Sequence, residues 1–319
     1  SMSTESGGSR FKRWKKPLTF AFFLLLIVLF TLLARRIDWS EVLQTLAAFK
    51  LRTLLIAGGL TLCSFLVYAS FDLIGRTYIR QDLRWKQILP VGIISYAFNL
   101  NLSAWVGGIA MRYRLYSRLG VSTSNIAKIL GLSLATNWFG YMAVAGGVFS
   151  SGLVTMPPGW KVSSGALQGI GVVLVLASLG YLAACQFAKK RAWSIKGIEI
   201  NLPSLRMACL QLALGALNWS LMAAVIFTLL PAKLDYPLVL GVLLISAIAG
   251  VITHIPAGLG VLEAVFIALM QHEASRGSLL AGLIAYRAIY FILPLLVAVV
   301  MYLAVEAKAK ALRVKKTPA

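Results

Sequence analysis

Two charged side chains lie in stretches of the chain that are otherwise apolar. Glu263 closely follows the break Pro256-Ala-Gly-Leu-Gly260, and Arg287 stands about ten residues into the last apolar run. A charge near the bilayer centre costs about 2.5–3.5 kcal/mol on insertion scales, so such residues are paired or in contact with water. If a helix restarts near Gly260, Glu263 falls in its first turn, where the helix dipole favours a negative charge. We therefore predict that Glu263 and Arg287 are partners, either as a structural ion pair or as a functional one.

A further cation, Arg112, follows the pair Gly107-Gly108. On a helix Arg114 and Arg118 share one face, whereas Arg112 lies about 200° from Arg114 at about 100° per residue. Arg112 can then point inward while the other two reach lipid headgroups. A cation near a helix N-terminus is disfavoured by the dipole, and a guanidinium suits phosphate, so this arrangement favours a visiting anion. The alternative is an ordinary basic loop.

Other polar residues in apolar surroundings give weaker indications. Asparagines that can hydrogen-bond across helices or line a polar groove are Asn99, Asn101, Asn137 and Asn218. Asp72 is expected to pair with Arg76, four residues further along its helix. His254 beside the Pro256 break is expected to cap a helix, with proton coupling as the alternative.

The composition excludes most protein classes. Of 319 residues 59% are hydrophobic and 13% are charged, against about 45–50% and 25% in soluble domains. The apolar runs are also too long for the strands of an outer-membrane barrel. The net charge of +21 is explained by basic loops against anionic headgroups, so we expect no nucleic-acid partner. The cysteines and histidines lack ligand-like spacing, so no metal or other cofactor is expected; they are Cys63, Cys185, Cys209, His254 and His272.

The chain is therefore predicted to be an all-α polytopic membrane protein with six full spans and two broken or re-entrant helical hairpins. The predicted spans are Leu18–Ala34, Thr53–Gly75, Ile126–Phe149, Ala166–Ala188, Met207–Leu230 and Ser278–Val305. The two interrupted stretches, Gln87–Tyr116 and Pro237–Met270, each contain a glycine cluster. Each stretch can form one crossing, two crossings or a re-entrant hairpin.

The distribution of lysine and arginine favours one topology. If both interrupted stretches return to their own side, most of the 31 Lys and Arg residues fall in cytoplasmic segments, and both termini are cytoplasmic. A single crossing by the first stretch would instead place most of them outside. The expected organisation is a basic N-terminus (1–17), one transmembrane domain (18–305) and a basic tail (306–319).

This topology contains an internal symmetry. Residues 18–149 and 166–305 each comprise helix, helix, hairpin and helix, in opposite orientations. Paired broken segments in inverted repeats indicate a transporter whose substrate binds near the bilayer midplane. The alternative is that the glycines only allow close helix packing.

The two glycine clusters also resemble the signatures of a known family. Pro256-Ala-Gly-Leu-Gly-Val-Leu-Glu263 with Tyr286-Arg287, and Asn99-Leu-Asn-Leu-Ser-Ala-Trp-Val-Gly-Gly-Ile-Ala-Met-Arg112, are similar to motifs of the membrane region of lysylphosphatidylglycerol synthetases, the multiple peptide resistance factors. The resemblance covers about residues 15–306 and extends to stand-alone members from the bacterial inner membrane. It implies a lipid-flipping domain and a possible homodimer. Because the chain ends at Ala319, the lysyl-transferring domain of longer members is expected to be absent.

We therefore expect a translocator of anionic or aminoacylated phospholipids in the bacterial inner membrane rather than an enzyme. The alternatives are a non-transporting partner of a lipid-synthesis enzyme, and an intramembrane headgroup transferase with Glu263 as base. We expect Arg112→Ala to stop lipid movement at near wild-type stability, and Arg114→Ala and Arg118→Ala to have mild effects. The candidate substrate-binding residues are Asn99, Asn101, Gly107, Gly108, Arg112, Asn137, Gly258, Gly260, Glu263 and Arg287.

Overall fold

The structure is a computed structural model. It describes residues 37–79 and 81–316 and, nearer the N-terminus, residues 13–18, 20, 21, 24, 25, 27, 28, 31, 32 and 35. The predicted first span, Leu18–Ala34, lies largely outside the described residues.

The described chain is almost entirely helical, as predicted. The α-helices are α2 (Trp39–Ala47), α3 (Leu51–Arg76), α4 (Trp85–Asn101), α5 (Arg112–Arg118), α6 (Thr123–Ser150), α7 (Ser164–Phe187), α8 (Leu205–Leu229), α9 (Tyr236–Thr253), α10 (Val261–Met270), α11 (Arg276–Tyr286) and α12 (Leu293–Lys316). Short helical turns of other types are η1 (Ala104–Met111), η2 (Pro256–Gly258) and η3 (Arg287–Ile292).

Six helical stretches among the described residues are long and apolar enough to cross a membrane. Five of them match predicted spans: α3, α6, α7, α8 and the continuous stretch from α11 through η3 to α12. The sixth is α9, the long arm of the second interrupted stretch. The prediction of an all-α polytopic membrane protein is confirmed.

Serine residues define where four of these helices begin. Ser122, Ser163, Ser204 and Ser275 precede α6, α7, α8 and α11, and each side chain accepts a hydrogen bond from the backbone N–H three residues later. Such caps stabilise a helix by about 1 kcal/mol each, because they satisfy an amide that has no partner within the helix.

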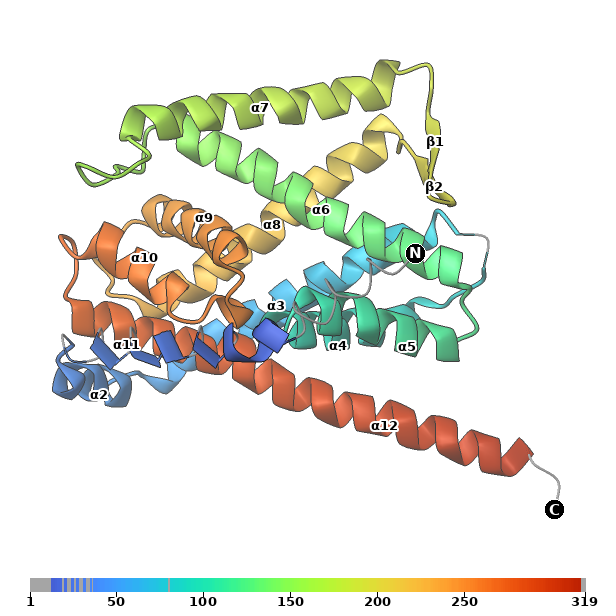
Figure 1. Cartoon of the computed structure of the whole chain (residues 1–319), viewed down its shortest axis with the longest axis horizontal. Coiled ribbons are helices and arrows are strands. Elements are labelled where there is room, and N and C mark those ends of the chain that lie inside the picture. The colour runs from blue at the N-terminus through green and yellow to red at the C-terminus, as the bar shows by residue number, and fades with distance from the viewer. Residues whose placement is uncertain are drawn as a thin grey trace.

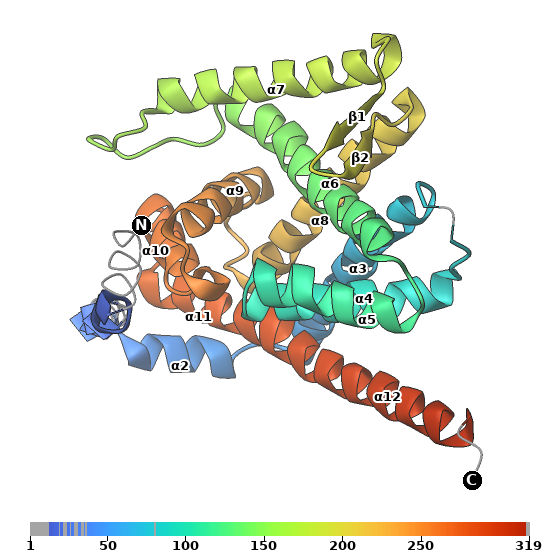
Figure 2. The ribbon, with the colours of Figure 1, turned by 45° about the vertical axis from the view of Figure 1, so that its right-hand side comes forward.

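Both interrupted stretches fold as helical hairpins that enter the molecule from opposite ends (Figure 1). In the first hairpin α4 runs inward, and η1 with α5 returns to the end where α4 began. In the second hairpin α9 runs inward, and α10 returns. The turned view shows the same approach of the two hairpins from opposite ends, and α4 contacts η2 where they meet (Figure 2).

The remaining helices bring the two hairpins together. Helices α6 and α8 cross where Gly140 faces Gly215, and a Cβ atom on Gly140 would lie 2.2 Å from the carbonyl carbon of Gly215. Only glycine permits this approach of two backbones, which is a common device in membrane helix packing. Helix α3 packs on α8 as well as on α4, so the core lies between the hairpins.

A small β-hairpin connects α7 and α8, where the sequence had suggested only a basic loop. Strands β1 (Ala192–Ile195) and β2 (Ile198–Asn201) are antiparallel, with Ile195 opposite Ile198. The turn residues Lys196 and Gly197 both have positive φ, as in the two-residue turns that suit hairpins. We call this side of the molecule the hairpin end; it also holds residues 77–79, 81–84 and 119–122 and the C-terminal part of α12 (Figure 1). The opposite side, which holds α2, is the α2 end.

Candidate functional site

The second break is a short stretch of left-handed backbone. His254, at the C-cap of α9, has φ of 54°, and Ala257, Gly258 and Gly260 also have positive φ. An alanine in this conformation is strained, and such strain is concentrated at functional sites. The expectation that His254 caps a helix is confirmed, because its backbone N–H bonds to the Val251 carbonyl.

Glu263 lies in the first turn of α10, as predicted. Its carboxylate accepts a hydrogen bond of 2.9 Å from the backbone N–H of Gly260, so it caps α10, the helix that follows the break. The N-terminal dipole of α10 adds to this stabilisation of the negative charge.

The predicted Glu263–Arg287 ion pair is present. Arg287 Nε donates to Glu263 Oε1 over 2.9 Å, and the two side chains are 12% and 16% exposed. The guanidinium also donates to the carbonyl oxygens of Ala257 and Gly258. One cation therefore holds both the carboxylate and the backbone of the second break.

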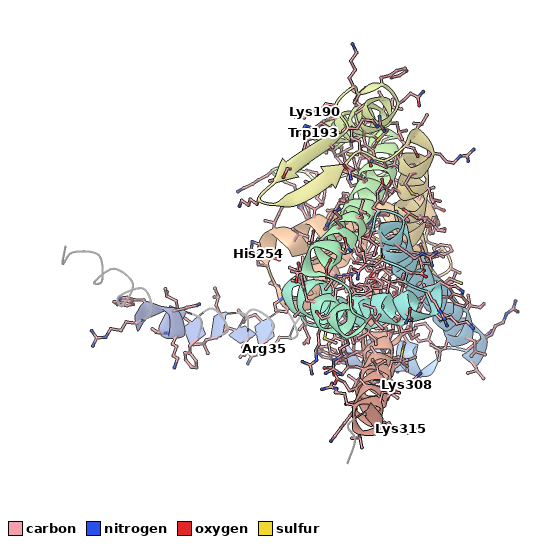
Figure 3. All side chains as sticks on the ribbon, turned by 90° about the vertical axis from the view of Figure 1, so that its right-hand side faces the viewer. Arg35, Lys190, Trp193, His254, Lys308 and Lys315 are labelled. Carbon is pink, nitrogen blue, oxygen red and sulfur yellow. The ribbon has the colours of Figure 1, made fainter. Side chains whose placement is uncertain are left out.

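A cavity of about 550 Å³ lies between the two breaks, a size typical of sites for small ligands. Its lining includes Asn99 at the end of α4, Gly258 in the second break and Arg287. Most other lining residues are apolar. The lining residues Val251 and His254 are exposed, so the cavity opens at the surface of the protein, and His254 lies on the outside of the molecule in the end-on view (Figure 3).

The first break has a different structure, without left-handed residues. It is a π-helical turn, η1, in which Gly107 packs on the backbone of α4. A Cβ atom on Gly107 would lie 1.8 Å from the backbone nitrogen of Asn99, whereas one on Gly108 would meet nothing closer than 3.8 Å. Asn101 connects this hairpin to η3 by donating to the carbonyl of Phe291 over 2.9 Å.

Arg112 points inward, as the helical angle predicted, and is fully buried, whereas the Arg114 side chain is 54% exposed. The Arg112 guanidinium donates to both carboxylate oxygens of Asp72, over 3.0 and 3.2 Å. It also donates to the carbonyl oxygen of Gly108 over 3.0 Å and to the hydroxyl of Ser133 over 3.1 Å.

The expectation that Asp72 pairs with Arg76 is wrong. Asp72 binds Arg112 and accepts a bond of 2.6 Å from the Tyr116 hydroxyl. A carboxylate inside a span is stabilised by the cation that shares its depth, not by one at the helix end. The inward direction of Arg112 was the available signal for this pair.

Four buried tyrosines connect the two ion pairs, a connection that the sequence did not predict. Tyr68, one turn before Asp72, stacks on Tyr96 with ring centroids 3.8 Å apart. The hydroxyls of Tyr96 and Tyr290 are hydrogen-bonded, and Tyr290 stacks on Tyr286, which lines the cavity next to Arg287. The signals in the sequence were the spacing of four between Tyr68 and Asp72 and between Tyr286 and Tyr290, and the place of Tyr286 beside Arg287 in the second motif.

Asn218 bonds across helices, as expected. Its Oδ1 accepts from Ser64 Oγ over 2.6 Å, and Ser64 Oγ also lies 2.6 Å from the Tyr290 hydroxyl. This cluster joins α3, α8 and η3 behind the cavity.

The structure thus brings some of the predicted site residues together and leaves others apart. Asn99, Gly258 and Arg287 line the cavity, and Glu263 and Gly260 bind one another at its edge. Arg112, with Gly108, lies in a separate buried cluster in this conformation. Asn137 contributes its backbone carbonyl to the indole N–H of Trp219, a cavity residue.

Comparison with known proteins gives matches over most of the chain. A family model described as the lysylphosphatidylglycerol synthase TM region matches residues 18–298, which include both breaks and both ion pairs. The inner membrane protein YbhN of Escherichia coli is 47% identical over 311 residues, which are 96% of this chain and 98% of that protein. The uncharacterized protein slr0712 of Synechocystis is 28% identical over 260 residues, 81% of this chain and 80% of that protein.

Proposed function

The chain belongs to the lysylphosphatidylglycerol synthase transmembrane family, and we propose that it translocates an anionic or aminoacylated phospholipid. It is a multi-pass inner-membrane protein, so the substrate is at hand in the bilayer. The observation that carries the proposal is the cavity of about 550 Å³ between two broken helices, with Arg287 in its wall. The headgroup enters this cavity while the acyl chains stay in the bilayer.

Arg287 is the group that recognises the phosphate. A guanidinium carries five N–H donors; two bonds to Glu263 and one each to Ala257 and Gly258 use four of them, so one N–H of Nη1 is left for a phosphate oxygen. These bonds orient the cation before the lipid arrives, and the N-terminus of α10 adds a positive dipole at the same place. An incoming phosphate competes with the Glu263 carboxylate for the Arg287 guanidinium and for the N-terminus of α10. Phosphate binding therefore weakens the ion pair that holds the second break.

Arg112 has a different role in this scheme. Because Asp72 and Ser133 already occupy its guanidinium, it positions the first break and keeps Gly107 against α4. The tyrosines between the two ion pairs supply a packed connection through which the two hairpins move together. Direct contact between Arg112 and phosphate requires that the bond to Asp72 open first.

Most of the basic segments that the structure describes lie at the hairpin end, so we propose that this end faces the cytoplasm. The count of Lys and Arg along the sequence extends this proposal to both termini. The lipid partner carries a phosphate, and a homodimer or contacts with lipid-synthesis enzymes are compatible with the exposed apolar faces of the helices. A transferase reaction with Glu263 as base has less support, because its two carboxylate oxygens bind Gly260 and Arg287.

Reconstitution tests this function. The purified chain is placed in liposomes with a fluorescent phosphatidylglycerol, and the fraction quenched by an impermeant reductant is followed in time. We expect wild type to expose inner-leaflet lipid at a rate that Arg287→Gln lowers at least about tenfold, which corresponds to about 1.4 kcal/mol. Arg114→Ala, which changes an exposed cation, is the matched control. Movement at the rate of empty liposomes contradicts the proposal and favours a non-transporting partner, and chemical turnover of the headgroup favours a transferase.

A further inference from the structure

A second cavity, of about 440 Å³, lies at the hairpin end, away from the site described above. It is bounded by α6, by Tyr181 of α7, by Gln211 of α8 and by the segment 200–203 of the β-hairpin. None of its lining residues belongs to the cavity between the breaks.

This cavity is a groove that follows one face of α6. Lys128, Gly131, Leu132, Ala135 and Phe139 line it, at spacings of three, four, seven and eleven residues. At 1.5 Å per residue the groove extends about 16 Å along the helix, a large part of the length of one bilayer leaflet. A Cβ atom on Gly131 would meet nothing within 4 Å, so the small residues leave the groove open instead of packing against a neighbouring helix.

The two ends of the groove differ in chemistry. Lys128 and Asn201 lie at the end next to the β-hairpin, together with Tyr78, which follows the end of α3. Burial, with a smaller effect of Cys185, raises the pKa of Tyr78, whose hydroxyl can donate a hydrogen bond to an anionic headgroup. The other end is formed by the apolar residues Leu132, Ala135 and Phe139. Tyr181 and Gln211 also lie there, and the Tyr181 hydroxyl donates to the Gln211 amide oxygen over 2.6 Å.

The surroundings of the polar end are strongly basic. Exposed cations on or beside the β-hairpin are Lys189, Lys190, Lys196 and Arg206. Figure 3, which looks onto this end, shows Lys190 beside Trp193, and the ammonium group lies 5.9 Å from the ring centroid. A groove with a cationic, hydrogen-bonding mouth and an apolar interior parallel to a membrane-spanning helix is complementary to a lipid with an anionic headgroup.

We propose that this groove holds one anionic phospholipid as a resident ligand, with its phosphate at Lys128 and one acyl chain along α6. This lipid is bound, not transported, because the groove is separate from the cavity between the breaks. The proposal stands on the groove alone and does not require translocation.

Two glycines of α6 provide a matched test. Gly131 and Gly147 are both exposed, and both have open space at Cβ, but only Gly131 lines the groove. Gly131→Leu and Gly147→Leu therefore add the same side chain at two positions where its Cβ atom meets no neighbour. After delipidation, native mass spectrometry measures the binding of added phosphatidylglycerol and phosphatidylcholine, and thermal unfolding in detergent checks that each variant folds.

We expect Gly131→Leu to lose the bound phosphatidylglycerol that Gly147→Leu retains. Lys128→Gln should weaken its binding about fivefold, the effect of about one cation at a lipid surface. Equal binding by the two leucine variants overturns the proposal. Equal binding of phosphatidylcholine overturns the anionic specificity, and displacement of the lipid by glycerol phosphate at similar concentration identifies a site for free phosphate instead.

Discussion

Arg287 is held by a carboxylate and by two backbone carbonyls, so removing Glu263 does not release it completely. Removing Arg287 costs more stability, because the Glu263 carboxylate then keeps only its hydrogen bond from the Gly260 amide. Removing one partner of a buried ion pair costs about 3–5 kcal/mol, and these side chains are largely buried, so the loss should approach the lower value.

The first prediction compares single and double substitutions. Glu263→Gln and Arg287→Gln should each lower the unfolding temperature, with the larger decrease for Arg287→Gln. The double variant should regain most of that stability because no uncompensated charge remains. If Arg287 binds the phosphate, the double variant folds but does not move lipid in liposomes. Recovery of both folding and lipid movement would show that the pair is only structural.

The second prediction concerns Arg112, for which the structure changes the expectation drawn from sequence. With Arg112→Ala the fully buried Asp72 loses its cation, and the free energy of unfolding should fall by about 3–5 kcal/mol instead of staying near wild type. Asp72→Asn combined with Arg112→Gln removes both charges and should restore at least half of this loss. Arg114→Ala removes an exposed cation whose partner Glu306 keeps its bond to Arg118, so this variant should unfold at nearly the wild-type denaturant concentration. A stable Arg112→Ala variant in denaturation experiments would contradict the buried pair.

At the scale of elements, the two breaks interrupt a helix inside the membrane with different backbone structures. The second break uses left-handed residues and a 3₁₀ turn, and the first uses a π-helical turn that keeps its hydrogen bonds. Backbone amides freed inside a membrane protein need such alternatives, since lipid supplies no partners.

The third prediction uses the neighbouring glycines of the first break. Gly107→Ala should destabilise the fold and reduce lipid movement, because the new methyl group overlaps the Asn99 backbone and must push η1 away from α4. Gly108→Ala introduces the same group into free space and should resemble wild type. Parallel measurement of unfolding temperature and liposome activity tests this pair. Equal behaviour of the two variants would argue against the close approach of η1 to α4.

The elements were more predictable from the sequence than the contacts between them. Long apolar runs predicted five of the spans, and the glycine clusters predicted the positions of both breaks. These predictions hold because unpaired backbone polar groups are costly in lipid, so a long apolar segment has few alternatives to a membrane-spanning helix. The Glu263–Arg287 pair followed because each was the natural partner for the other's charge. Other contacts join residues that are far apart in the sequence, such as Arg112 with Asp72 and the buried tyrosines with one another. The separation reaches 226 positions between Ser64 and Tyr290, and no local sequence pattern encodes contacts over such separations. The β-hairpin was missed because a Lys-Gly turn is a weak signal within a basic segment.

At the scale of the whole molecule, the arrangement divides the connecting segments between two ends. The hairpin end holds the β-hairpin and the C-terminal part of α12. In the view onto this end, Lys190 lies at the β-hairpin, and Lys308 and Lys315 lie on α12 at the opposite edge of the molecule (Figure 3). The α2 end holds α2 and the segment 151–163 between α6 and α7 (Figures 1 and 2). Because a membrane-spanning protein places its two ends on opposite sides, the orientation of one segment determines that of all the others.

The last prediction tests this orientation. Reporter fusions after Lys196 and at the C-terminus should report the cytoplasm, because the basic residues of the hairpin end resist export. A tag inserted in Thr155–Trp160, at the α2 end, should be reached by an impermeant reagent from the periplasm. The two results depend on each other, since residues 151–163 and the β-hairpin are joined by the single helix α7. A C-terminus and a β-hairpin on opposite sides would contradict the structure itself. Both on the periplasmic side would preserve the fold but reverse the membrane orientation, and would place the groove along α6 in the outer leaflet of the same membrane.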